Sequence, residues 1–262
     1  MKSKFFNNLI IALVLIFLFL PIFVLVLYSF NESDTNIVFK GFTFKWFIEL
    51  FNNKSLIEAF FNTILIALCS TVISTVIGTI SAVGLHRYNF KLKGFINTLL
   101  YIPIVIPEIV LGISLLSVYT LTKLELGLFT IMLSHIVFSI PYVIVSVRSV
   151  LNKRINKQEE ASYDLGVGRF KTFWYITLPN IMPGIVSGAT LAFTLSLDDV
   201  VISYFTAGPG SNTLPLNIYS MIKTGITPDV NALSTLVLLL VIICLTFLVI
   251  YDSKKLKGEV SR

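Results

Sequence analysis

Long apolar runs separated by shorter polar segments dominate the pattern of residues along the chain. Six of these runs are long enough to cross a bilayer, since a spanning helix needs about 20 mostly apolar residues. They lie near 9–29, 59–85, 95–119, 127–149, 181–204 and 231–251. The pattern therefore predicts an all-α membrane protein with six transmembrane helices, forming a single transmembrane domain over residues 1–262.

The composition agrees with a membrane protein. Hydrophobic residues make up 55% of the chain and charged residues only 13%, whereas soluble domains carry about a quarter charged residues. The net charge of +6 does not indicate a nucleic-acid partner, because the basic residues are scattered between apolar stretches. Cys69 and Cys244 both lie inside apolar runs, so we expect no disulfide, no metal site and no cofactor.

The distribution of Lys and Arg predicts the orientation in the bilayer. With the N-terminus inside, fifteen of the 20 Lys and Arg residues fall in inner segments. The remaining five are Lys40, Lys45, Lys54, Lys123 and Lys223. Because basic residues concentrate on the cytoplasmic side, we expect a multi-pass protein of the bacterial cytoplasmic membrane with both termini in the cytoplasm.

A polar loop over residues 152–180, between the fourth and fifth runs, carries the most informative motif. It contains Glu160-Ala161-Ser162, then Gly166, then Ile176-Thr177-Leu178-Pro179. Residues 158–165 can form a short helix that Gly166 ends in a left-handed cap, and 170–178 can form a second piece. This order of residues resembles the EAA loop of permease subunits in binding-protein-dependent ABC importers. Ser162 departs from the pattern, which has a second Ala there. We call residues 152–180 the EAA-like loop.

The resemblance extends over most of the chain. The segments 195–203 (LSLDDVVIS), 214–221 (LPLNIYSM), 228–233 (PDVNAL) and 103–110 (PIVIPEIV) look like the second permease subunit of spermidine/putrescine importers. The resemblance implies a type I ABC importer permease (MetI-like) fold and transport of polyamines.

The resemblance also implies the partners and the coupling residues. A second, related permease subunit, a dimer of an ABC ATPase and an extracytoplasmic solute-binding protein would complete the machine, and the last would deliver substrate to the outer segments 31–58 and 205–230. The ATPase would contact the EAA-like loop, and the residues carried over from the motif are Glu160, Ala161, Gly166, Leu178 and Pro179.

The chain itself lacks a convincing phosphate-binding motif. The segment 166–172 superficially resembles one, but Phe170 occupies the position where that motif needs Gly before Lys171. We therefore expect a transport subunit without catalytic residues, driven by a partner's ATP hydrolysis or by an ion gradient.

Ionisable residues inside the apolar runs are the candidates for a transport pathway. Asp198, Asp199 and Glu108 are costly in a membrane and are expected to face a cavity or a partner. With Tyr204 nearby, acidic groups suit an organic cation such as a polyamine. Alternatively, the acids pair with Lys or Arg of the second permease and hold a gate together. Both interpretations stay open for the two aspartates, and pairing is favoured for Glu108.

Two alternative functions remain. An ABC permease for another solute, such as iron or thiamine, would share every feature except the polyamine segments. A proton-coupled secondary transporter would use the membrane acids for proton transfer, but would be expected to show inverted repeats, and none is visible.

Small residues predict how the helices pack. Gly184, Gly188 and Ala192 recur every four residues in the fifth run, and Ser74, Gly78 and Ala82 do so in the second. Such spacing places each set on one face, where backbones approach closely. His135 is expected to be a packed polar residue, not a ligand.

Overall fold

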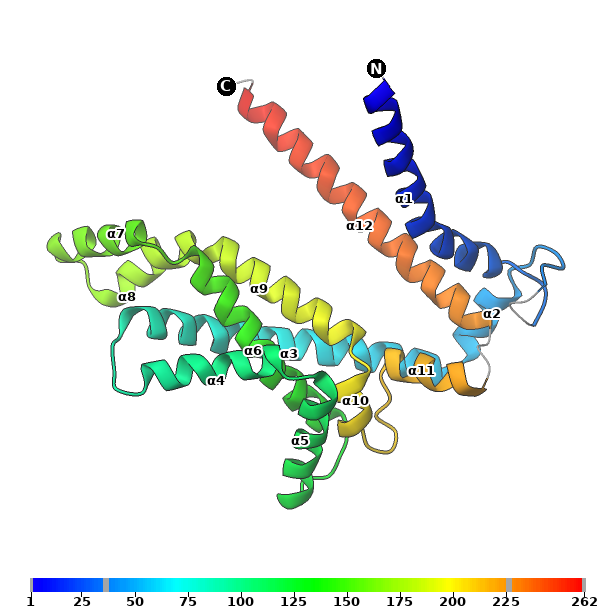
Figure 1. The fold of residues 1–262 in the computed structure, drawn as a ribbon, viewed down its shortest axis with the longest axis horizontal. Helices are drawn as coiled ribbons and strands as arrows, with labels where there is room; N and C mark the ends of the chain where they lie inside the picture. The colour runs from blue at the N-terminus through cyan, green and yellow to red at the C-terminus, as the bar shows by residue number, and fades with distance from the viewer. Residues whose placement is uncertain (1, 35–37, 225–227, 261–262) are drawn as a thin grey trace. The chain divides into compact units, whose positions relative to one another are not determined.

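The computed structural model describes residues 2–34, 38–224 and 228–260, and these residues are almost entirely helical (Figure 1). The contacts along the chain divide the structure into two compact units. One combines Met1–Ile57 with Ser220–Arg262, and the other is Glu58–Tyr219. Parts of both outer segments, 35–37 and 225–227, lie outside the described residues. Each unit is described by itself.

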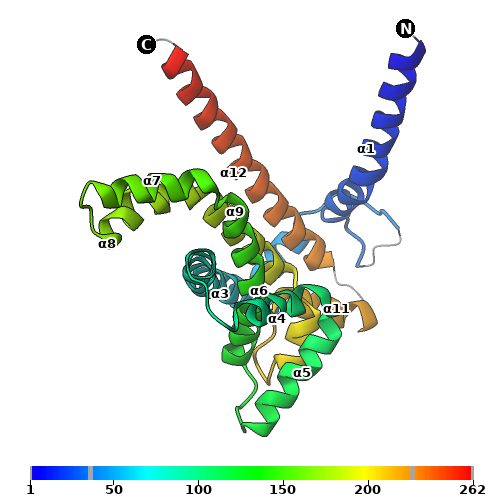
Figure 2. The same ribbon diagram turned by 60° about the vertical axis from the view of Figure 1, so that its left-hand side comes forward.

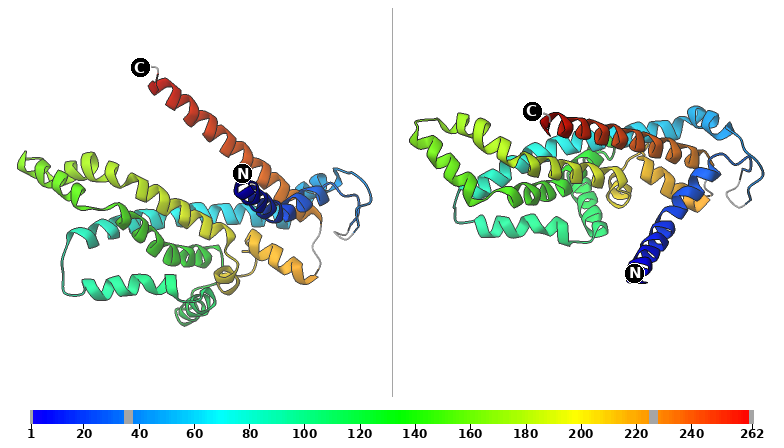
Figure 3. Two further views of the ribbon diagram at one scale, coloured as in Figure 1. Left: turned by 45° about the horizontal axis from the view of Figure 1, so that its top comes forward. Right: turned by 90° about the horizontal axis from the view of Figure 1, so that it is seen from above.

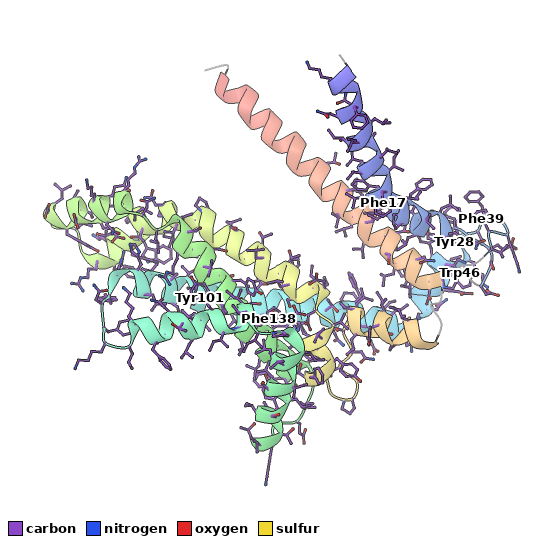
Figure 4. All side chains as sticks on the ribbon, viewed as in Figure 1. Phe17, Tyr28, Phe39, Trp46, Tyr101 and Phe138 are labelled. Atoms are coloured by element: carbon purple, nitrogen blue, oxygen red, sulfur yellow. The ribbon has the colours of Figure 1, made fainter. Side chains whose placement is uncertain are left out.

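The first unit is built from α1 (Lys2–Tyr28), α2 (Lys45–Asn52) and α12 (Pro228–Val260). α12 packs against α1 and α2, and the Asn53 amide donates to the Asp229 carboxylate over 2.7 Å. Trp46, labelled in Figure 4, is buried and donates its indole N–H to the carbonyl of Asn31. These contacts fix the segment after α1, where Lys45 donates to Asp34 and the pKa of its ammonium is raised by that hydrogen bond.

The second unit contains the remaining helices. They are α3 (Lys54–Arg87, whose first turn belongs to the first unit), α4 (Lys93–Val105), α5 (Glu108–Leu121), α6 (Leu128–Val150), α7 (Lys153–Asp164), α8 (Arg169–Thr172), the π-helical segment η1 (Phe173–Thr177), α9 (Leu178–Asp198), α10 (Val201–Thr206) and α11 (Leu214–Thr224, which ends in the first unit). α6 is central: it packs on α9, α4 and α10, and its buried Val143, Ile144 and Val147 join Ala82 and Ile181 in one apolar core. α7 and α8 form a hairpin at one end (Figure 2).

The apolar helices agree with five or six membrane crossings. By length and composition, four helical stretches among the described residues can span: Phe6–Tyr28, Lys54–Arg87, Leu128–Val150 and Arg169–Asp198. The predicted third span, 95–119, is instead the pair α4 and α5, bent by 110° at Ile106-Pro107 (Figure 3). In α12, the apolar stretch within the described side chains is Pro228–Ile243, shorter than a full span. α9 ends at Asp198, short of the predicted boundary near 204.

The two stripes of small residues are buried packing faces, as predicted. A Cβ added to Gly184 would lie 2.6 Å from Val150 Cγ2 and 2.8 Å from the carbonyl oxygen of Ser146. At Gly188 it would lie 3.0 Å from Val143 Cα, and at Gly78 it would lie 2.7 Å from Val143 Cβ. α6 therefore approaches α9 and α3 so closely that a methyl group does not fit.

Gly184→Ala is therefore expected to destabilise the folded protein by about 1–3 kcal/mol, because the new methyl would collide with the α6 backbone. Thermal unfolding in detergent measures the effect. Gly84→Ala is the matched control, since a Cβ there meets nothing within 4 Å and alanine favours a helix. An unchanged melting temperature for Gly184→Ala would contradict the close packing.

Candidate functional site

Hydrogen bonds define both ends of α7, the first arm of the EAA-like loop. The side chain of Asn152 caps the start by accepting from the N–H groups of Arg154 and Ile155, over 3.0 and 3.2 Å. At the end, Gly166 takes φ +78°, while Val167 N–H donates to the Ser162 carbonyl over 3.0 Å. The left-handed Gly166 and this bond are the signs of a Schellman cap at the end of α7. The left-handed glycine is confirmed, and the helix begins five residues before the expected start near 158.

The second arm returns through α8 and η1 into α9. Leu178 is the first residue of α9, Pro179 follows it, and both come directly after the π-helical segment η1. The two arms meet at a hydrogen bond of 2.9 Å between the buried hydroxyls of Ser162 and Thr172. Serine in place of the second alanine of the motif therefore ties the two arms together.

Glu159, which the motif does not single out, holds the loop to the body of the second unit. Its buried carboxylate accepts from Arg87, at the end of α3, and from the hydroxyl of Thr177. Arg87 also donates to Thr177 over 2.8 Å. A signal was present in the sequence: Ile155, Glu159 and Ser162 lie at helical spacing, and all three are buried.

The opposite side of the EAA-like loop is open. Glu160 and Ala161 are exposed, and so are the apolar side chains of Leu165 (84%), Phe170 (76%) and Tyr175 (80%). Glu160 also lines a cleft of about 290 Å³. The residues lining this cleft are His86, Arg87, Tyr88, Asn156, Glu159, Glu160, Tyr163 and Arg169. Exposed apolar groups beside charged ones are typical of a surface that binds another protein.

The second candidate site lies at the break between α9 and α10, where Asp199 takes an extended conformation. Asp199 is buried, and its carboxylate caps α10. Oδ1 accepts from the N–H of Ile202 over 3.1 Å, and Oδ2 accepts from the N–H and the hydroxyl of Ser203 over 2.7 and 2.8 Å. A carboxylate that receives several donors is well compensated for burial. Residues of this chain supply all of these donors.

His135 on α6 completes a buried polar cluster around the break. Its Nε2 lies 3.3 Å from Asp199 Oδ2 and 3.2 Å from Ser203 Oγ, while Nδ1 lies 2.6 Å from Ser196 Oγ. The ring of Phe138, labelled in Figure 4, meets the imidazole edge to face at 5.3 Å. His135 is thus the packed polar residue that the sequence predicts. Within the described residues there is no cluster of His, Cys, Asp or Glu that could hold a metal ion.

The other predicted pathway residues are exposed on nearby elements. Asp198 is exposed at the end of α9, and Tyr204 is 57% exposed on α10. Glu108, also exposed, opens α5 one turn before Gly112, and a Cβ at Gly112 would lie 2.7 Å from Phe205. α5 and α10 therefore pack together, which places the helices that carry Glu108 and Tyr204 side by side.

Comparison with known proteins identifies relatives along nearly the whole chain. Residues 74–253 match the family model described as binding-protein-dependent transport system inner membrane component. The chain is 41% identical over 243 residues to the spermidine/putrescine transport system permease protein PotC of Escherichia coli K12, covering 93% of this chain and 92% of that protein. It is 39% identical over 240 residues to PotC of Haemophilus influenzae, covering 92% and 93%. It is also 39% identical over 229 residues to the putrescine transport system permease protein PotI of E. coli K12, covering 85% and 82%.

A solved structure confirms the fold prediction. A chain from the crystal structure of a bacterial ABC transporter involved in the import of the acidic polysaccharide alginate superposes with a TM-score of 0.69, covering 96% of both chains at 12% identity. At that identity the likeness concerns the fold alone. The family match and the close relatives together show that this chain belongs to the binding-protein-dependent transport system inner membrane components.

Proposed function

We propose that the chain is a permease subunit of an ATP-driven importer for the polyamines spermidine and putrescine. The observation that carries this proposal is the 41% identity over 93% of the chain to a permease named for those two solutes. The acidic Asp198 and Glu108, both exposed in the isolated chain, fit a cationic cargo. An anionic solute would be repelled by the same groups.

The EAA-like loop is the proposed docking element for the partner ATPase, which hydrolyses the ATP. Glu160, Ala161 and Gly166 lie on its open side, and Leu178 and Pro179 begin α9, the helix that leads from the loop to the break. The contacts of Glu159 and Ser162 hold the loop rigid, so a movement of the loop would also displace α9. We expect the loop and both termini to lie in the cytoplasm, because most Lys and Arg residues fall in the segments on that side.

The proposed pathway runs past the break between α9 and α10. Asp198, Glu108 and Tyr204 would contact the passing cation, and Asp199 would shape the break beside them. A second related permease would supply the other wall, and an extracytoplasmic binding protein would deliver the solute. Closure of the ATPase pair on ATP would turn the cavity outward, and hydrolysis would return it inward.

The test is uptake of labelled spermidine and putrescine into proteoliposomes that hold this chain with its neighbouring permease, ATPase and binding protein. We expect uptake that requires ATP, and Asp198→Asn is expected to lower it up to about fivefold, because an exposed ion pair contributes up to about 1 kcal/mol. Asp198→Glu, which keeps the charge, is the control. Uptake driven by a proton gradient without ATP would overturn the importer, and ATP-driven uptake of iron or thiamine alone would overturn the polyamine assignment.

A further inference from the structure

The buried cluster at the break joins α6, α9 and α10 through one imidazole, and reaches α3 through Ser196. His135 stands on α6, Ser196 in the last turn of α9, and Asp199 and Ser203 at the start of α10. On the far side, Ser196 Oγ lies 3.2 Å from Ser70 Oγ of α3. His135, Ser196, Ser203 and Ser70 are all less than 5% exposed. The imidazole therefore touches both sides of the break between α9 and α10, and it is held by bonds that solvent does not reach.

The donors and acceptors of the cluster assign the role of each nitrogen. Asp199 Oδ2 already accepts from the N–H and O–H of Ser203, so the Ser203 oxygen is left to accept from His135. Nε2 must then carry a proton, which it shares between Asp199 and Ser203. Nδ1 is left to bond Ser196. His135 therefore bonds to α9 through Nδ1 and to the cap of α10 through Nε2.

The two adjacent aspartates are left in different chemical situations. Both carboxylate oxygens of Asp199 already accept from groups of this chain, so Asp199 is less available than Asp198 to a passing cation. Asp198 is exposed. A change of backbone conformation at Asp199, which is extended with ψ 125°, separates the two side chains. The direction in which Asp198 points therefore depends on the geometry of the break.

We propose that His135 is a positioning residue for transport: it fixes the break between α9 and α10 and so holds the Asp198 carboxylate toward the pathway, while Asp199 serves as the anchor of that break and does not bind cargo. The assignment of Asp198 to a pathway rests on the proposed function. The link from His135 to the position of residue 198 does not.

A labelling experiment on the assembled transporter tests that link without any assumption about the cargo. In a background with Cys69→Ala and Cys244→Ala, Asp198→Cys is reacted with a positively charged methanethiosulfonate reagent. We expect His135→Leu to change the labelling rate by about fivefold or more, since buried polar contacts that act as a unit fail together. His135→Gln retains an amide donor and acceptor and is expected to restore most of the original rate.

Ser139→Ala is the matched control, because Ser139 lies one turn further along the same buried face and its hydroxyl has no partner among the described residues. Should His135→Leu fail to assemble, Ser196→Ala breaks only the bond to Nδ1 and is expected to shift the labelling rate in the same direction. Equal labelling rates in wild-type and variant backgrounds would overturn the positioning role.

Uptake of the transported solute tests the division between the aspartates. His135→Leu and Asp199→Asn are each expected to lower the maximal rate by up to about fivefold, no more than Asp198→Asn does, and the double variant is expected to be no slower than the worse single one. His135→Leu is likewise expected to add little to the loss of Asp198→Asn, because His135 acts through the Asp198 carboxylate. If the first pair multiplied instead, Asp199 would act independently of His135 and the anchor role would be wrong. Transport of a solute other than a polyamine would overturn the proposed function. The two double-variant comparisons could still be made with that solute.

Discussion

Gly166→Val is expected to lower ATP-driven uptake at least about tenfold, while Gly168→Val, two residues along the same loop, leaves uptake nearly unchanged. Gly166 has φ +78°, a conformation that costs an L-residue about 1–2 kcal/mol and a β-branched residue more. Gly168 has φ −67° and ψ 152°, which valine adopts readily. A Cβ at either position meets nothing within 4 Å, so the backbone alone distinguishes the two sites.

The strain acts on the turn that joins the two arms of the EAA-like loop. If valine forces Gly166 out of the left-handed region, the Schellman bonds at the end of α7 are lost and the proposed contact of Glu160 and Ala161 with the ATPase is disturbed. Gly166→Asn is expected to retain intermediate uptake, because asparagine tolerates this conformation. Uptake rates in proteoliposomes measure all three variants. Equal loss at Gly166 and Gly168 would show that side-chain bulk at the docking surface, and not the turn, is responsible.

Features that depend on nearby residues were predicted well from the sequence. Gly166 was expected in a left-handed cap because a polar helical pattern ends just before it. The stripes at Gly184 and Gly78 were expected to pack because small residues recur at helical spacing. Most of the apolar runs corresponded to single helices, because a segment that crosses a bilayer must pair its backbone polar groups internally and a helix does so.

Features that depend on distant contacts were not predicted. The third apolar run was expected to be one helix, whereas α4 and α5 meet at a bend of 110°, and α5 packs against α10. The break after Asp198 escaped notice because its cause is the side chain of Asp199, which caps α10 and meets His135 from α6. A run of apolar residues through 204 gives no hint of these bonds.

The same limit explains why the motif indicated Glu160 and not its neighbour. Sequence spacing identifies which residues resemble a known contact with a partner, and Glu160 is indeed exposed. It does not identify which glutamate is buried against Arg87, at the end of a helix more than seventy positions earlier. The structure thus gives the adjacent glutamates opposite surroundings, one facing the body of the protein and one facing outward.

Glu159→Gln is accordingly expected to destabilise the protein by about 2 kcal/mol and to reduce uptake, whereas Glu160→Gln leaves stability unchanged. Removing the Glu159 charge leaves the Arg87 guanidinium without its carboxylate. Breaking a buried pair costs about 3–5 kcal/mol, and the effect here is smaller because the Arg87 side chain is 23% exposed and keeps some access to water. Thermal unfolding in detergent separates the two variants, and ATPase-coupled uptake then reports what each does to transport.

A double variant shows whether the cost comes from the unpaired arginine. Replacing both partners with apolar groups of similar size is often nearly neutral, so Arg87→Met/Glu159→Met is expected to recover most of the stability lost in Glu159→Met alone. Recovered stability without recovered uptake would mean that the ion pair transmits force between the loop and α3 in addition to holding them together. A double variant as unstable as the single one would instead locate the cost in the bond from Thr177, because that hydroxyl loses its acceptor in both.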